Sequence, residues 1–223
     1  MPGDAKVPPA RLVRLVEGVR ARVGSLHRKM VPPQVAMIDL ISGSMVTQAL
    51  YAAAKLGIAD VLKDGPLRAK DIADRVHAHP DAVNRLMRAL ASQGVFRVDG
   101  QGRYSLTALG RTLRSDAEVP MGSMAMMVGS PEHWEHWGHL LDSVRDGGDA
   151  VSKVRGMDVW AYFEQNRSYA EVFNTAMTSM SAFAKAPVLA AYDFSGFRKI
   201  VDGRDPAAVA GLRPSRRVAT PTS

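Results

Sequence analysis

The chain of 223 residues contains no cysteine, and aromatic residues make up only 6% of it. Without cysteine it has neither a disulfide scaffold nor a thiolate metal site, and this absence is typical of a reducing compartment. We expect no apolar stretch to approach the roughly 18 residues that cross a bilayer, and no signal-type segment to follow residues 1–4. Since 46% of the residues are hydrophobic, the sequence predicts a globular protein of the cytoplasm.

The net charge of +7 is unevenly distributed along the chain. Residues 1–35 hold seven Lys and Arg against two acidic residues, and residues 203–223 hold four against one. The segment between them, residues 36–202, has 18 basic and 19 acidic residues. Because nucleic-acid affinity depends on clustered basic side chains that neutralise phosphates, this near-neutral body disfavours a nucleic-acid partner.

A basic amphipathic helix is predicted over residues 10–29, within an N-terminal helix and linker of residues 1–36. Its apolar residues recur at helical spacing with arginines between them, namely Leu12, Val13, Leu15, Val16, Val19, Val23 and Leu26. Packing on its own subunit or on a partner is favoured over an anionic membrane, because the helix lacks anchoring aromatic residues. The prolines at 32 and 33 are expected to end it.

A second helix is expected from about Met37 to Leu56, and its many small residues would let another helix approach closely. It opens a unit of residues 37–115. The remaining elements predicted in this unit are helices over residues 69–76 and 80–93, a C-cap glycine at Gly94, strands over residues 95–98 and 103–106, and a last helix with Thr107 as N-cap. Two helices followed by a hairpin form the order of a winged helix.

A winged helix commonly inserts its second helix into the DNA major groove. Here that helix offers Asn84, Arg85 and Arg88, and the hairpin offers Arg97 and Arg103. So few arginines in a near-neutral body make a weak phosphate footprint. A packing and dimerisation module is therefore favoured over a DNA-binding regulator.

Residues 116–196 are predicted to be helical and are rich in methionine and aromatic residues. Helix breaks are expected near residues 129–131, 147–148 and 156, where glycine and proline occur. Methionine-rich surfaces of this kind are typical of a core, because methionine fills irregular gaps. They also suit a pocket for flat, apolar ligands.

Three histidines in this segment, His133, His136 and His139, are spaced three residues apart. Adjacent pairs could share a metal ion, but the outer two lie about 120° apart on a helix. No cysteine and no distant histidine-rich element completes a ligand set, so we expect no metal site. Solvent-facing or lid-lining histidines are favoured.

Residues 197–202, Phe-Arg-Lys-Ile-Val-Asp, are typical of the opening strand of a nucleotide-binding α/β sheet. A glycine-rich turn and a helix should follow such a strand. The chain continues instead with Gly203-Arg204-Asp205-Pro206 and a tail rich in Ala, Arg and Pro. We expect residues 203–223 to be disordered and not part of the preceding fold.

Several segments resemble those of the S-adenosylmethionine-dependent small-molecule O-methyltransferases, the group that contains the caffeic-acid, hydroxyindole and anthracycline O-methyltransferases. They are residues 45–62, 69–96, 104–107, 156–160 and 172–177, and the resemblance covers about residues 37–202. It implies a winged-helix dimerisation domain, lid helices over the acceptor, and a Rossmann-like domain that binds the methyl donor and supplies a histidine base. The expected fold is mainly α with a small β-wing, ending at the first strand of a missing Rossmann-like domain.

The resemblance also implies roles for particular residues. The family's lid motif Phe-Asn-x-x-Met matches Phe173, Asn174 and Met177, which implies acceptor contacts there. The neighbours implied in the acceptor site, with less support, are Ser181, Met180, Trp160 and Met126. For the cofactor, S-adenosyl-L-methionine, the implied candidates are Asp202 and, with less support, Ser181.

The chain departs from the family after Asp202, where relatives continue with Val-Gly-Gly-Gly-x-Gly. Glycines let backbone amides approach the cofactor, whereas Arg204 adds bulk and Pro206 lacks an N–H. We therefore expect a reading frame cut short near residue 202, with the catalytic base beyond the end of the chain and no cofactor binding by this chain alone. The activity implied is methylation of a hydroxyl on a small aromatic or polyketide-like acceptor. The alternatives are a winged-helix DNA-binding regulator, or a dimerisation partner of an intact relative. As partners we expect a second copy of the chain or an intact relative, bound through residues 37–115, and no nucleic acid or membrane.

Overall fold

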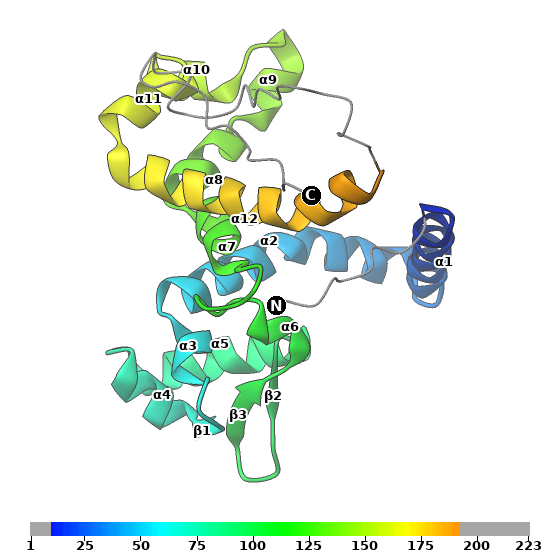
Figure 1. Cartoon of the computed structure of the whole chain (residues 1–223), viewed down its shortest axis with the longest axis vertical. Helices are drawn as coiled ribbons and strands as arrows, with labels where there is room; N and C mark the ends of the chain where they lie inside the picture. Colours follow the sequence, from blue (N-terminus) through cyan, green and yellow to red (C-terminus); the bar gives the residue numbers. More distant parts are fainter. Residues whose placement is uncertain (1–9, 192–223) are drawn as a thin grey trace, which may run out of the picture.

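The computed structural model describes residues 10–191, which form a mostly helical molecule with one small sheet (Figure 1). The strand predicted at residues 197–202, the tail of residues 203–223 and the cofactor candidate Asp202 lie outside the described residues. Helix α2 (Pro33–Lys55) crosses the middle of the molecule. In the view of Figure 1 a helical unit lies above it, and a mixed unit of helices and strands lies below it.

Helix α1 (Ala10–Lys29) has the predicted range and projects to one side of the body, near the start of α2 (Figure 1). Its apolar side chains are largely exposed, as Leu15 at 61%, Val16 at 57% and Leu26 at 60% illustrate. The predicted packing of this helix on its own subunit is therefore wrong. Packing on a partner remains a prediction.

Helix α2 begins at Pro33, four residues before the predicted start at Met37. Proline suits the first position of a helix, because the amide hydrogen it lacks would have no intrahelical partner there. By length and mean hydropathy alone α2 could span a membrane, so the expectation that no apolar stretch approaches that length is wrong. One such helix is weak evidence for a membrane, since core helices of other proteins share these properties.

The mixed unit follows α2 and consists of seven short elements. They are α3 (Ile58–Val61), β1 (Leu67–Arg68), α4 (Ala69–Arg75), α5 (Pro80–Ser92), β2 (Phe96–Val98), β3 (Arg103–Leu106) and α6 (Ala108–Arg111). The strands form one antiparallel sheet in the order β1-β3-β2. The predicted order of two helices followed by a hairpin is confirmed, while β1 and α3 were not predicted.

Local signals in the sequence set the ends of these elements. Pro80 occupies the first turn of α5, and Gly94 follows that helix with a φ of 72°, a left-handed conformation that favours glycine. Thr107 is the N-cap of α6, as predicted, and its hydroxyl accepts a hydrogen bond from the Gly110 amide (3.1 Å). The Thr107 hydroxyl also reaches the carbonyl oxygens of Gly94 and Val95, both at 2.8 Å. The cap therefore ties α6 to the chain that leaves α5.

The core of the mixed unit lies between α4, α5 and the sheet. Its largest fully buried side chains are Phe96, Ile58, Ile72, Met87 and Leu90. They come from α3, α4, α5 and β2. Further buried residues from α2 to β3 complete the cluster. The unit therefore has its own hydrophobic core.

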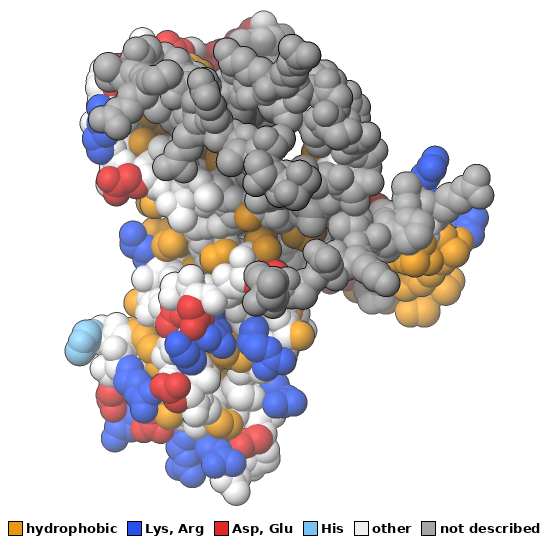
Figure 2. All heavy atoms as spheres, in the orientation of Figure 1, with side chains coloured by type: hydrophobic (Ala, Val, Ile, Leu, Met, Phe, Trp, Pro, Cys, Tyr) orange, Lys and Arg blue, Asp and Glu red, His pale blue; other side chains and the backbone are white. Residues whose placement is uncertain are grey.

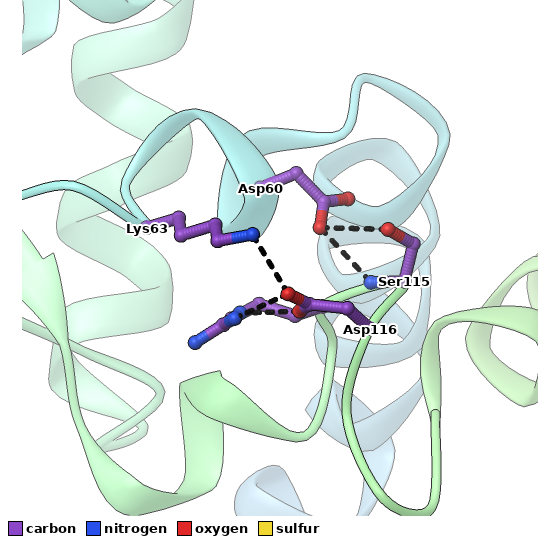
Figure 3. A network of polar contacts seen from close by, with 5 residues as sticks. Asp60, Lys63, Ser115 and Asp116 are labelled. Atoms are coloured by element: carbon purple, nitrogen blue, oxygen red, sulfur yellow. Dashed lines mark hydrogen bonds and ion pairs between the residues drawn. The ribbon is translucent and has the colours of Figure 1, made fainter.

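A polar network fastens the segment after α6 to α3 (Figure 3). The Asp60 carboxylate accepts hydrogen bonds from the Ser115 amide (2.9 Å) and hydroxyl (3.0 Å). Asp116 pairs with Lys63 (2.9 Å) and with Arg114 (2.6 Å), and these partners lower the pKa of the Asp116 carboxyl. The network fixes the point where the chain leaves the mixed unit.

The upper unit is a series of helices with short connections. They are α7 (Gly122–Gly129), α8 (Pro131–Gly138), α9 (Leu140–Asp146), α10 (Ala150–Arg155), α11 (Val159–Gln165) and α12 (Arg167–Ala191). The breaks predicted near residues 129–131, 147–148 and 156 are confirmed. Gly147 and Gly156 each end a helix with a positive φ.

Helix α7 joins the two units, because it packs against both α2 and α12. A Cβ atom added to Gly129 would lie 2.2 Å from the Tyr51 Cβ, so only glycine allows this approach to α2. The Gln48 side-chain amide donates to the Gly129 carbonyl (3.0 Å). On the other side, the Ser123 and Ser179 hydroxyls meet at 3.3 Å in a buried contact with α12.

Candidate functional site

The predicted acceptor residues gather mainly on one face of α12. Phe173, Asn174, Met177, Met180 and Ser181 span an arc of about 120° around the helix axis. The buried Ala176 and Ser179, which face inward, follow Met180 around the helix at about 40° and 100° from it. The arc therefore runs from the edge of the buried side of α12, at Met180 and Phe173, to the exposed Asn174 and Ser181.

Side chains on this arc combine apolar and polar character. Phe173 and Met177 are half-buried, whereas Met180 is 39% exposed and Asn174 and Ser181 are exposed. The Asn174 carbonyl accepts the Thr178 hydroxyl (2.9 Å) as part of the helix backbone. The side-chain amide of Asn174 is exposed and can both donate a hydrogen bond to a ligand and accept one from it.

An aromatic cluster extends the arc toward α11. The Phe173 and Phe163 ring centroids are 4.7 Å apart, and Trp160 meets Phe163 edge to face at 5.9 Å. Trp160 is held by the N-cap of α11, because the Asp158 carboxylate accepts its backbone amide at 2.8 Å. Its side chain is nevertheless 60% exposed, so it offers an aromatic face.

Met126 is connected less directly to this group. It lies on α7 and is half-buried, and α7 packs against α12. The structure thus unites five of the predicted residues on α12, joins Trp160 to them through Phe163, and places Met126 on a neighbouring helix.

The histidine segment forms a separate cluster on α8. His136 is buried, so it is not solvent-facing, and the lid-lining alternative stays a prediction for it. Its Nε2 atom accepts from the Arg155 Nε (3.2 Å), and the Arg155 guanidinium lies 4.7 Å from the Tyr162 ring centroid. Among residues 10–191, no group of three His, Cys, Asp or Glu is placed to hold a metal ion.

Burial and charge act together on these histidines. Burial, and next the Arg155 charge, lower the pKa of His136, and burial also lowers the pKa of His133. His133 Nε2 accepts from the Trp137 indole (2.7 Å), and His136 Nε2 likewise acts as an acceptor. Both contacts need an unprotonated Nε2 atom, so the neutral forms fit the observed hydrogen bonds.

Arg155 and Phe163 were not identified as functional residues from the sequence. Arg155 is 19 residues from His136, so no short motif connects them. Phe163 appeared only as one of many aromatic residues in the segment. Its spacing of three from Trp160 on one helix was the available signal.

A hollow with a cavity volume of about 490 Å³ lies on another side of α12. Its wall comes from the segment after α6, including Asp116, Glu118, Val119 and Met121, and from Phe183. Its charged groups have both signs. The residues that line this hollow do not include Trp160, Phe163 or Phe173 of the aromatic cluster.

The structure leaves fewer side chains free for DNA contacts on this surface than the sequence suggested. The Asn84 side chain accepts the Tyr104 hydroxyl (2.9 Å), so it has a structural use. Arg103 pairs with Asp99 at 2.8 Å on the hairpin. Arg85 and Arg88 on α5 and Arg97 on β2 remain exposed. Three exposed arginines are a small basic patch for a phosphate backbone.

Comparison with known proteins gives two family matches. A model described as the O-methyltransferase dimerisation domain matches residues 38–116, and one described as the O-methyltransferase domain matches residues 137–210. The second match continues beyond Asp202. Together the two models cover most of the chain.

Individual relatives agree with the family matches. The phenazine O-methyltransferase PhzM of Lysobacter antibioticus is 34% identical over 77% of this chain and 50% of its own. The crystal structure of LaPhzM matches with a TM-score of 0.74 at 34% identity, over 77% of this chain and 52% of that one. Human N-acetylserotonin methyltransferase, solved with SAM, has a TM-score of 0.68 at 26% identity, over 73% and 50% of the chains. This chain spans about half the length of the curated relatives it matches.

Proposed function

The chain belongs to the S-adenosylmethionine-dependent O-methyltransferase family, and we propose that its α12 face binds the small aromatic or polyketide-like acceptor whose hydroxyl is methylated. This proposal rests on the ring contacts that connect Trp160, Phe163 and Phe173, next to Asn174 in the sequence. Aromatic faces stack on a flat acceptor, and a neighbouring amide fixes its orientation by hydrogen bonding.

Each residue of the proposed site has a distinct role. Trp160 and Phe173 provide apolar walls, and Met177 and Met180 adapt to the outline of the ligand because methionine is flexible and polarizable. Asn174 hydrogen-bonds a hydroxyl or carbonyl of the acceptor. Met126 on α7 contributes from the neighbouring helix. These residues bind and orient, which places a hydroxyl oxygen for attack.

The residues described here do not by themselves fit the cofactor. S-adenosylmethionine carries an amino acid, a ribose and an adenine, each of which needs polar partners, and Ser181 is the one proposed cofactor contact within residues 10–191. Arg204 and Pro206, beyond Asp202, replace residues that would give a glycine-rich amide cradle. We therefore propose that this chain alone does not bind the donor, and we derive no transfer step through it.

The mixed unit together with α2 is proposed to act in dimerisation, as a winged-helix module of residues 37–115. Its complete core supports this, because a unit that folds by itself can present α2 to another subunit. A second candidate function follows from the same observation. Paired with an intact relative, the chain would regulate that relative by occupying its dimer interface.

The two binding proposals are tested by calorimetry on the full chain. We expect 2-naphthol, as a flat hydroxylated probe, to bind with a Kd between micromolar and millimolar. Asn174→Ala and Met177→Ala should each weaken it at least fivefold, whereas Thr175→Ala, on the opposite side of α12, should leave it unchanged. Equal affinity in all variants would reject the acceptor face.

The same titration with S-adenosylmethionine tests the cofactor proposal. We expect no heat of binding at micromolar concentrations of the chain. Micromolar binding, or transfer of a labelled methyl group to 2-naphthol by the purified chain, would show that residues 203–206 do not prevent donor binding.

A further inference from the structure

The side chain of Arg155 on α10 is largely withdrawn from water. Figure 2 shows Lys, Arg, Asp and Glu side chains spread over the visible surface of the mixed unit. Arg155, by contrast, is only 19% exposed, against 30% for Lys153 on the same helix. A charged group that leaves water needs partners that replace its hydration. The partners of Arg155 therefore show what this side chain does.

The Arg155 guanidinium is held by side chains of two other helices. Its Nε atom donates to the Nε2 atom of His136 (3.2 Å), and its Nη2 atom donates to the Glu135 carboxylate, both on α8. The face of the guanidinium lies 4.7 Å from the centroid of the Tyr162 ring on α11. A planar guanidinium can donate at its edge while its face stacks on a ring, which an ammonium group cannot do. Arg155 thus joins α8, α10 and α11 at one point.

Tyr162 is the first of a series of rings that leads to the proposed acceptor face. Its ring centroid is 6.1 Å from that of Tyr169, which is 5.6 Å from that of Phe163. Phe163 in turn contacts Phe173 and Trp160. Tyr169 and Phe163 are buried. Because closely packed rings leave little free space, a displacement of Tyr162 has to move its neighbours.

Helix α11 is short and depends on these side-chain contacts for its position. Gly156, with a φ of 69°, ends α10 before it, and Asn166 alone separates it from α12. A helix of seven residues has little stability of its own, so tertiary packing must hold it. This helix carries Trp160, whose exposed ring belongs to the proposed acceptor face.

We propose that Arg155, held by the His136 imidazole, is a positioning residue that sets α11 and its Trp160 ring for the aromatic acceptor. The inference rests on the proposed acceptor face and adds to it two residues that do not touch the ligand. Protonation of His136 would turn its Nε2 atom into a donor and place a second positive charge against the guanidinium. Binding of the acceptor is therefore coupled to the protonation of His136.

The titratable groups that face the His136 ring come from its own helix and from α10 and α11. They are Glu132, His133, Glu135, Arg155 and Tyr162. Helix α7 packs on α8 and has no titratable side chain. The charged groups of α9 are exposed or paired elsewhere, namely Arg145, Asp142 with His139, and Asp146 with Lys153. Burial and the Arg155 charge lower the pKa of His136 from its ordinary value of 6.5, so the ring is neutral at pH 7.5.

Calorimetric titration of the full chain with 2-naphthol at pH 7.5 tests the positioning role. We expect Arg155→Ala to raise the Kd at least fivefold. Lys153→Ala, which removes a basic side chain and its ion pair from the same helix, should stay within twofold of the unmodified chain. Arg155→Ala/Tyr162→Leu should bind no more weakly than Tyr162→Leu, because Arg155 acts through that ring.

The pH profile of the same titration tests the coupling with Arg155 in place. The 2-naphthol hydroxyl, like that of other phenols, stays protonated between pH 5.0 and 7.5, so a change in affinity comes from the protein. The Kd of the unmodified chain should rise at least threefold as the pH falls across this range. His136→Gln, which offers an oxygen that cannot be charged, should lose this dependence. His139→Gln, at an exposed position, should retain it.

The outcomes separate the positioning role from the acceptor face itself. Binding that is weakened by Asn174→Ala but not by Arg155→Ala, and that does not vary with pH, would leave the acceptor face and reject the positioning role. Fully additive effects of Arg155→Ala and Tyr162→Leu would also reject it. An unmodified chain that binds no 2-naphthol would reject the acceptor face and this inference with it. If Arg155→Ala does not fold, the pH profiles of the unmodified chain and of His136→Gln decide.

Discussion

The mixed unit below α2 and the helical unit above it differ in how they bury apolar residues. The mixed unit encloses 13 buried hydrophobic residues in one cluster, counting Ala53 of α2. The corresponding cluster of α11 and α12 has three buried members, Phe163, Tyr169 and Ala170. The upper unit also exposes large side chains, such as Trp137 at 60% and Val144 at 74%.

This difference teaches which surfaces are available for binding. In the mixed unit the side chains of α4, α5 and the sheet pack against one another, so only the outer surface of this unit is left for contacts with other molecules. In the upper unit apolar and aromatic side chains remain uncovered, which fits a surface that meets a ligand or another part of a protein. The larger core thus lies in the mixed unit, and the larger share of exposed aromatic side chains lies in the upper unit.

The largest expected effect comes from removing a core ring in each unit. Phe96→Ala, in the mixed unit, should cost about 3–5 kcal/mol in the free energy of unfolding, because the close-packed site cannot collapse. Phe163→Ala, in the small upper cluster, should cost no more than about 3 kcal/mol. Urea unfolding followed by circular dichroism measures both. Equal losses would show that the two units are equally well packed.

A glycine at the joint between the units gives the next largest effect. Gly129→Ala should cost about 1–3 kcal/mol, because its Cβ would overlap the Tyr51 side chain and push α7 away from α2. Gly43→Ala is the control, since a Cβ there meets no atom within 4 Å, and it should stabilise α2 by about 0.5–1 kcal/mol. Thermal unfolding of both variants measures the difference. A neutral Gly129→Ala would mean that the units are not held by this contact.

The mixed unit could be predicted largely from its sequence because its signals are local. Pro80, Gly94 and Thr107 mark the ends of elements by their own conformational preferences, independently of distant residues. Strand β1 escaped prediction because two residues, Leu67 and Arg68, show no periodicity, and its partner β3 is distant in the chain.

The candidate site could be predicted only in part. The arc on α12 was named through the family motif at Phe173, Asn174 and Met177, and helical spacing then places these residues together. The contact between His136 and Arg155 could not be predicted, because it depends on how α8 and α10 meet and not on any spacing. Residues brought together by packing of short helices leave no pattern in the sequence.

Helix caps provide a finer comparison of the two units. Thr107→Ala should cost about 1–2 kcal/mol, because its hydroxyl joins the Gly110 amide to the carbonyls that follow α5. Asp149→Ala, at the N-cap of the exposed α10, removes the bond to the Ser152 amide (2.8 Å) and should cost about 0.5–1 kcal/mol. Thermal unfolding compares them. A larger loss for Asp149→Ala would reverse the assigned order of stability.

The smallest expected effect is a pH dependence confined to the upper unit. Burial and the Arg155 charge lower the pKa of His136 from its ordinary value of 6.5, so the folded state binds fewer protons than the unfolded one. The contribution of neutral His136 is therefore complete above pH 6.5 and is lost as the pH falls below that value toward the folded-state pKa. His136→Gln keeps an acceptor for Arg155 and cannot be protonated. Between pH 7.5 and 5.5 it should lose less Tm than the unmodified chain, by on the order of 2 °C. His139→Gln, at an exposed position of the same segment, should retain the full pH response, and a response equal in all three proteins would assign the dependence to other groups.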